Sequence, residues 1–260
     1  MTRLDSTWYG AEDKPVDAPV LVLGNSLGST QGMWAPLIPE LASRFRVLAV
    51  EHRGHAGSEV PPGPYTIDDL GGDVLALMDE LGIGTFRFAG LSLGGMVGMW
   101  LAAHAPERVE RLALVCTSAH FPPAQGWLDR AATTRAKGSA AVAEGVVSRW
   151  FTEGFREREP EKVKAAIAMI EATPDEGYAG CCEAIAAMDL RPVLGRITAA
   201  TLVVAGAEDP ATPPAHGEVI VAAVPGARLE VVADAAHMAV LEQPEAVGAL
   251  LTAHLSGEAS

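Results

Sequence analysis

Three residues of the sequence have the types and chain order needed for nucleophilic catalysis: Ser92, Asp209 and His237. Ser92 lies in the segment GLSLG, residues 90–94, which matches the G-x-S-x-G pattern of a nucleophilic serine on a sharp turn between a strand and a helix. The backbone of such a turn is strained, and glycines two residues to either side prevent collisions between Cβ atoms. The apolar run Phe86–Ala89 precedes the motif and a helix-forming stretch follows it. The alternative interpretation is a glycine-rich contact between a helix and a sheet.

A serine hydroxyl is a weak nucleophile at neutral pH, so it needs a general base and an acid that orients this base. In proteins with this serine motif, the acid and then the histidine follow the serine along the chain. Asp209 follows a predicted strand and His237 follows the last one, so both agree with that order. We predict Asp209 as the acid because it lies one residue further into its loop than Glu208, the alternative, and precedes a proline. His216 is the alternative base.

Such a reaction also needs N–H donors directed at the oxygen that becomes negatively charged in the tetrahedral intermediate. The backbone amide of Leu93, directly after the nucleophile, is the first candidate. The second lies in the loop GNSLGS, residues 24–29, which follows the first main strand, and we predict Leu27 there. This chemistry requires neither a metal ion nor a cofactor, and we predict none.

The elements that must position these residues follow from short apolar runs that alternate with helical patterns. Strands are predicted at Pro19–Leu23, Arg46–Val50, Phe86–Ala89, Arg111–Cys116, Thr201–Ala205 and Arg228–Val232. Continuous apolar runs of this kind are typical of strands that are covered on both faces, as in parallel sheets. The segment Ile67–Leu81 has apolar residues at helical spacing, and Gly82 follows as a stop signal. The pattern predicts an α/β fold with a doubly wound, mostly parallel sheet and right-handed crossovers.

The alternation stops between Ala119 and Thr198, where no run resembles a strand and several segments have a helical pattern. We therefore predict a helical lid, residues 119–198, inserted into a core formed by residues 1–118 and 199–260. Insertions of this kind usually lie over the carboxyl ends of the strands, where open α/β sheets bind their ligands.

The composition limits the partners and the compartment of the protein. With 19 basic and 33 acidic residues, the formal net charge is −14, which argues against nucleic acid or an anionic membrane surface as the main partner. The sequence starts without an apolar signal segment, and no run reaches the roughly 18 apolar residues that a spanning helix needs. Cys116, Cys181 and Cys182 are odd in number and lack metal-site spacing, which is typical of a reducing compartment. We expect a soluble, cytoplasmic protein.

From about Pro19 to its end, the chain resembles the α/β-hydrolase superfamily. The resemblance rests on the motifs GNSLGS, EHRGHAGS, GLSLGG, GAEDPATP and DAAHM, the last three of which hold the predicted nucleophile, acid and histidine. More narrowly, the chain looks like the bacterial 3-oxoadipate enol-lactonase family, on the basis of GPYTIDDL, GLSLGGMVG and the lid stretches RWFT and EGYAGCCEAIAAMDLRP. It departs from the superfamily in the short segment before its first main strand. The antiparallel hairpin that commonly opens this fold is therefore expected to be shortened or absent.

The narrower resemblance implies a carboxylic ester hydrolase that opens 3-oxoadipate enol-lactone, a five-membered lactone with one free carboxylate. Ser92 would attack the lactone carbonyl, and water activated by His237 would then release 3-oxoadipate from the acyl-enzyme. A cofactor-free haloperoxidase or perhydrolase, or another carboxylesterase, uses the same triad and is the alternative. A third hypothesis, the least favoured, is a hydrolase fold that binds a ligand without turnover.

The free carboxylate of such a substrate requires a cation in the pocket. Arg130 and Arg135 lie in the lid segment GWLDRAATTRAKG, and a guanidinium can bind a carboxylate with two parallel hydrogen bonds. Trp127 lies three residues before Arg130, on the same helical face, and is predicted to form an apolar wall. Ser26 in the oxyanion loop is the remaining predicted substrate contact. The alternative for both arginines is a solvated lid surface.

Overall fold

The computed structural model describes residues 2–257, which fold around one seven-stranded sheet with the order β1-β3-β2-β4-β5-β6-β7. The strands are β1 (Ser6–Tyr9), β2 (Val20–Gly24), β3 (Arg46–Val50), β4 (Phe86–Leu91), β5 (Val109–Val115), β6 (Ala200–Gly206) and β7 (Arg228–Val232). β1 pairs with β3 in antiparallel orientation, and every other neighbouring pair is parallel. The predicted doubly wound, mostly parallel sheet is confirmed.

The strands that were predicted as buried apolar runs are found within a few residues of their expected ends. β3 and β7 coincide with the predictions, whereas β4 continues to Leu91 and so ends directly at Ser92. The strand that was not predicted is β1, whose sequence STWY is short and has no alternating pattern. It is half-buried at the edge of the sheet, where Ser6 lies opposite Val50. One short antiparallel strand therefore precedes the parallel sheet.

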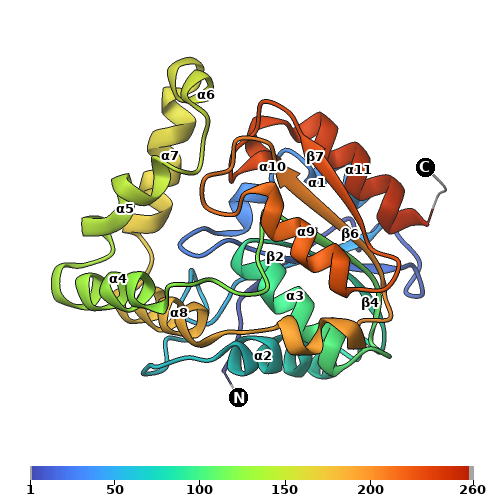
Figure 1. Cartoon of the computed structure of the whole chain (residues 1–260). Coiled ribbons are helices and arrows are strands. Elements are labelled where there is room, and N and C mark those ends of the chain that lie inside the picture. Colours follow the sequence, from blue (N-terminus) through green and yellow to red (C-terminus); the bar gives the residue numbers. More distant parts are fainter. Residues whose placement is uncertain (1, 258–260) are drawn as a thin grey trace.

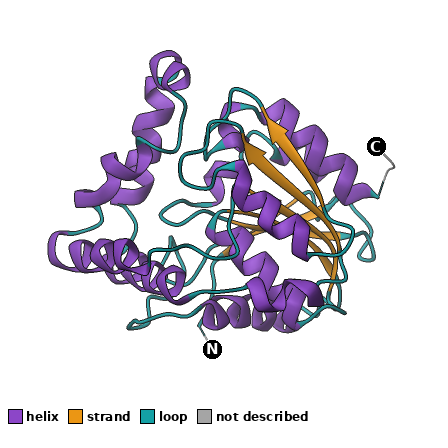
Figure 2. Ribbon diagram, viewed as in Figure 1, coloured by secondary structure: helices purple, strands orange, loops and turns teal. Residues whose placement is uncertain are grey.

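The helices of the core cover both faces of the sheet (Figures 1 and 2). They are α1 (Ile38–Arg44), α2 (Ile67–Glu80), α3 (Leu93–His104), α9 (Pro214–Ala223), α10 (Ala239–Glu242) and α11 (Pro244–Ser256), with the short 3-10 helices η1 (Gln31–Trp34) and η2 (Arg191–Arg196). The predicted helix over residues 67–81 is confirmed as α2. It starts at a capping box, in which the Thr66 side chain accepts from the Asp69 N–H and the Asp69 carboxylate accepts from the Thr66 N–H.

Helix α3 lies under the centre of the sheet and carries the predicted nucleophile at its N-terminal end. It is apolar on all sides and almost fully buried, as expected for a helix enclosed by other elements. A Cβ atom on Gly98 would lie 2.9 Å from the Phe88 ring in β4. The glycine therefore lets α3 approach the sheet closely, which fixes the position of the first turn of the helix.

Between β5 and β6 the chain forms the cap, which consists of α4 (Ala124–Lys137), α5 (Ala140–Val147), α6 (Glu153–Arg158), α7 (Pro160–Glu171) and α8 (Asp175–Ala187). Figure 1 shows these helices, in yellow-green to gold, beside the carboxyl ends of β6 and β7. α4 packs along α8, and α5 packs against α7. None of the helices within residues 2–257 combines the length and the apolar character that crossing a bilayer would require.

Candidate active site

Ser92 occupies a strained turn between β4 and α3. Its φ angle is 56°, in a region that residues with a side chain rarely adopt. A Cβ atom on Gly90 would collide with the Gly94 carbonyl, and a Cβ atom on Gly94 would collide with the carbonyl of Gly24 in the neighbouring strand. The two glycines of the motif are therefore required by the close approach of three backbone segments, as the pattern predicted.

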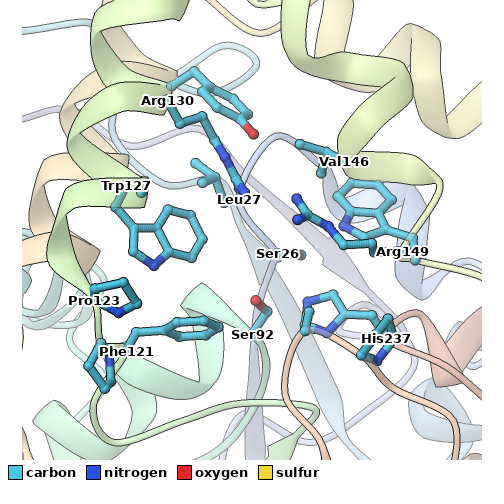
Figure 3. Close-up of a pocket in the computed structure, with 16 residues that line it drawn as sticks. Ser26, Leu27, Ser92, Phe121, Pro123, Trp127, Arg130, Val146, Arg149 and His237 are labelled. Carbon is cyan, nitrogen blue, oxygen red and sulfur yellow. The ribbon is translucent and has the colours of Figure 1, made fainter.

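Hydrogen bonds from neighbouring elements hold this turn in place. The Ser92 N–H donates to the Val115 carbonyl at 2.9 Å, and the Thr117 hydroxyl donates to the Ser92 carbonyl at 2.7 Å. The backbone groups of Ser92 are thus fixed by the end of β5, while its hydroxyl remains in a pocket. In Figure 3 this hydroxyl and the His237 ring face the same space.

The structure brings Asp209 and His237 together at the carboxyl end of the sheet. The His237 Nδ1 lies 2.8 Å from Asp209 Oδ2, and both side chains are buried. An Nδ1–H that donates to the carboxylate leaves Nε2 free to accept a proton from Ser92. Glu208, the alternative acid, is exposed. The pairing therefore favours Asp209 as the orienting acid.

Asp209 is held as a carboxylate by several donors. The N–H groups of Ala211 and Thr212 donate to Oδ1 at 2.8 and 3.0 Å, and the Thr212 hydroxyl donates to Oδ2 at 2.6 Å. Burial alone raises the pKa of Asp209, but His237 and these hydrogen bonds outweigh burial and hold that pKa well below its usual range. A permanently ionised Asp209 can stabilise a positively charged His237 during the reaction.

His216, the alternative base, lies in α9 against Phe121, with 5.6 Å between the ring centroids. It is not among the residues that line the pocket around Ser92, whereas His237 is. Burial lowers the pKa of His216. The geometry favours His237 as the base.

Two backbone amides next to Ser92 are free to act as oxyanion donors. Within residues 2–257, the N–H groups of Leu27 and Leu93 donate to no backbone or side-chain acceptor. Leu93 follows the nucleophile directly, and Leu27 lines the same pocket as Ser92. Unused donors at these two places can stabilise a negative oxygen that forms at the carbonyl attacked by Ser92.

The loop that carries Leu27 is held by two buried histidines, His52 and His55. The Gly28 N–H donates to His55 Nε2 at 2.9 Å, and His52 Nε2 lies 2.9 Å from the Asn25 carbonyl. Burial, with the neighbouring His52, lowers the pKa of His55 to about 3. His55 is therefore neutral and can accept the Gly28 hydrogen bond, which fixes the backbone next to Leu27.

The pocket above Ser92 has a volume of about 370 Å³ and lies between the core loops and the cap. Its lining consists of Ser26, Leu27, Ser92, Phe121, Pro122, Pro123, Gly126, Trp127, Arg130, Val146, Arg149, Trp150, Tyr178, Pro210, Ala211 and His237. Of the predicted substrate contacts, Ser26, Trp127 and Arg130 are in this lining. The Arg130 guanidinium lies over the Trp127 ring, 4.4 Å from its centroid.

Arg135, the other arginine predicted to contact substrate, is not in the lining of this pocket. Its guanidinium pairs with Glu176 at 2.8 Å and also with Glu183, both on α8. Glu176 further accepts from the Gly63 N–H at 2.7 Å, in a loop of the core. The role of Arg135 in this structure is to join two cap helices to each other and to the core.

Several residues of the pocket were not identified from the sequence, above all Arg149 and Tyr178. Trp150 is both buried and part of the lining. Arg149 and Trp150 belong to the motif RWFT, and Tyr178 belongs to EGYAGCCEA. Both motifs had been noted as carriers of the resemblance, but nothing in their local pattern indicates which side chains face a pocket.

Comparisons with known proteins agree with this geometry. The family model of the alpha/beta hydrolase fold matches residues 19–244. The chain belongs to this family. A relative named 3-oxoadipate enol-lactonase 2, from Acinetobacter baylyi, is 42% identical over 230 residues, which is 88% of this chain and 86% of the relative. A solved structure of the enol-lactonase from Burkholderia xenovorans LB400 superimposes with a TM-score of 0.95 at 42% identity, covering 98% of this chain and 97% of that one.

Proposed function

We propose that this protein is a carboxylic ester hydrolase that opens the ring of 3-oxoadipate enol-lactone and releases 3-oxoadipate. The observation that carries the proposal is the buried hydrogen bond between His237 and Asp209 at 2.8 Å, in a pocket that also holds Ser92. The 42% identity with a relative named 3-oxoadipate enol-lactonase 2 supports this substrate. The volume of about 370 Å³ is in the range of small-molecule sites.

In the first half of the proposed reaction, the Ser92 oxygen attacks the lactone carbonyl while its proton moves to His237 Nε2. Asp209 stabilises the positive charge that forms on His237. The N–H groups of Leu27 and Leu93 stabilise the negative charge on the carbonyl oxygen. Collapse of the tetrahedral intermediate breaks the ring C–O bond, and the proton on His237 passes to the leaving oxygen, which gives the enol and restores neutral His237. Only modest acid assistance is needed because an enolate is a better leaving group than an alkoxide.

In the second half, His237 removes a proton from a water molecule, which attacks the acyl-enzyme. The same two amides stabilise the second tetrahedral intermediate, and Ser92 leaves with the proton held by His237. The released acyl group is a carboxylic acid that ionises at neutral pH, and the freed enol converts to the ketone. All bonds are made and broken by protein groups and water.

The free carboxylate of the substrate is proposed to bind Arg130. The guanidinium lies in the pocket above Ser92, and its stacking on Trp127 holds the side chain in that position (Figure 3). Trp127 and Ser26 complete this proposed contact surface. Cys116, Cys181 and Cys182 are free thiols, which supports a reducing compartment, and we place the reaction in the cytoplasm.

The test is a time course of ultraviolet absorbance with freshly generated enol-lactone and the purified protein. We expect rapid loss of the lactone signal with wild-type protein and no catalysed loss with S92A. S43A, which removes an exposed hydroxyl on α1, is the matched control and should behave as wild type. A wild-type rate equal to the spontaneous rate, or full activity in S92A, would disprove the proposal.

A further inference from the structure

Two arginines of the cap reach the pocket without a carboxylate partner. Arg130 comes from α4 and Arg149 follows α5, and Figure 3 shows both guanidinium groups extending into the space above Ser92. Within residues 2–257, no carboxylate forms a hydrogen bond or an ion pair with either group. Arg135 of the same cap, by contrast, pairs with two carboxylates.

The two unpaired charges act on each other. Partial burial and the positive charge of Arg130 lower the pKa of Arg149, although a guanidinium remains protonated at neutral pH. Two like charges at one pocket repel each other, so the arrangement of these two arginines is electrostatically unfavourable by itself. An anion between the two guanidinium groups would turn this repulsion into attraction.

Tyr178 supplies a third donor at the same place. Its side chain is fully buried and lines the pocket beside Arg130, and among the described residues its O–H group has no acceptor. Burial raises the pKa of Tyr178, so the phenol keeps its proton. A buried O–H group without an acceptor is destabilising, and this one lies close enough to Arg130 and Arg149 to be affected by both charges. The three donors therefore form one cluster.

Hydrogen bonds to the catalytic loop fix the segment that carries Arg149. The Trp150 carbonyl accepts from the Met238 N–H at 2.9 Å, directly after His237. The Glu242 carboxylate accepts from the Thr152 N–H at 2.8 Å and from the Ala236 N–H at 2.6 Å. The backbone next to Arg149 is thus tied to both sides of His237, so the Arg149 side chain extends into the pocket from a segment that is fixed relative to the triad.

We propose that Arg149 and the Tyr178 hydroxyl bind the carboxylate of the substrate together with Arg130, and so select acyl chains that end in an anion. The donors come from three segments of the cap. They lie at one pocket and lack a negatively charged acceptor, which the carboxylate of a substrate would supply. The identity of the substrate rests on the proposed function. The presence of a carboxylate site does not, because it follows from the cluster of donors itself.

The first test is binding of adipate, a dicarboxylate that is not hydrolysed, measured by titration calorimetry with adipamide as the neutral probe. We expect R149Q to weaken adipate binding about tenfold or more, since a hydrogen bond to a charged group contributes about 1.5–3 kcal/mol. R149K should be intermediate because it keeps the charge and loses the planar fork. Y178F, which removes only the hydroxyl, should weaken adipate binding a few-fold.

The matched control is R158Q, which removes the same charge from an exposed position on α6, outside the pocket. It should bind adipate as wild type does, and adipamide binding should be the same in all variants. Wild-type affinity of R149Q for adipate, or equal losses for adipate and adipamide, would overturn the proposal. If R149Q fails to fold, as judged from its thermal melting, adipate and adipamide binding by R149K and Y178F test the proposal instead. Wild-type affinity of both variants for adipate would then overturn it.

The second test compares turnover of two p-nitrophenyl esters with acyl chains of equal length, one ending in a carboxylate and one in a methyl group. R149Q should raise KM about tenfold for the first ester only, with little change in kcat. If R149Q is active and its KM for the ester that ends in a carboxylate is unchanged, the proposed carboxylate site is contradicted, whereas the lactonase proposal is unaffected. Selective adipate binding in a protein that does not open the lactone supports the site and contradicts the lactonase proposal.

Discussion

The core loops and the cap line the same pocket, but they differ in hydrogen bonding. The polar groups of the core loops have partners within the protein, whereas the donors of the cap do not have carboxylate partners. In the core, Asp209 accepts from His237 and from three groups of the next loop residues, and Gly28 is held by His55. In the cap, Arg130, Arg149 and Tyr178 face the same space, and among the described residues none of them pairs with a carboxylate. Saturated groups keep a fixed orientation, as catalysis requires, whereas unsatisfied donors are available to a ligand.

The largest expected effect comes from removing the Asp209 carboxylate, whose hydrogen bonds in the core loops are all formed within the protein. D209N removes the carboxylate that sets the His237 tautomer, so we expect kcat to fall about 10⁴-fold, as for the corresponding change in serine proteases. Lactone turnover under saturating substrate measures this effect. E208Q changes the exposed neighbouring carboxylate and should retain wild-type kcat. Comparable losses in the two variants would contradict the assignment of Asp209.

The next effect concerns the pH dependence of stability through His55. Its pKa is about 3 in the folded protein, below the ordinary value of 6.5, so the unfolded chain binds the proton more readily. Between these two values the free energy of unfolding should decrease as pH falls, by about 1.4 kcal/mol per pH unit from this residue. Urea unfolding of wild type and H55Q between pH 7 and pH 4 measures the two slopes. The slope of H55Q should be smaller, and an equal slope would contradict a neutral, buried His55.

A smaller effect separates two arginines of the same cap helix. R130Q should raise KM for the lactone about tenfold and leave the melting temperature nearly unchanged, because its guanidinium contacts substrate in this account. R135Q should do the reverse and lower the free energy of unfolding by about 1 kcal/mol, since its two ion pairs are partly exposed to solvent. Steady-state kinetics and thermal melting of both variants provide the comparison. A larger KM change in R135Q than in R130Q would contradict it.

The catalytic part of the site could be predicted because its determinants are local. The collisions that exclude side chains at Gly90 and Gly94 act within a few residues of Ser92, so the motif carries the geometry of the turn. Asp209 and His237 follow strands of one parallel sheet, and their carboxyl ends meet at one edge. The strands themselves were predictable as continuous apolar runs, which are required when both faces are covered.

The recognition part could not be predicted in the same way, because it depends on how the cap helices pack. Arg149 and Tyr178 lie far apart in sequence, and only the pairing of α4 with α8 and of residues 149–152 with the His237 loop brings them together. The helical spacing of the two arginines on α4 could, however, have predicted that they do not face the same pocket. Arg130 and Arg135 are five positions apart, about 140° around α4, so they face different neighbours. β1 was missed because a short edge strand needs no apolar pattern.

The most direct test of Ser92 as the nucleophile of this pocket is covalent labelling with a fluorophosphonate followed by peptide mass spectrometry. We predict one phosphonyl group per chain, located on Ser92, and loss of lactone hydrolysis in proportion to labelling. D209N should label much more slowly because its base is misoriented. Label on another residue, or full lactone turnover by protein that is completely labelled on Ser92, would contradict the account.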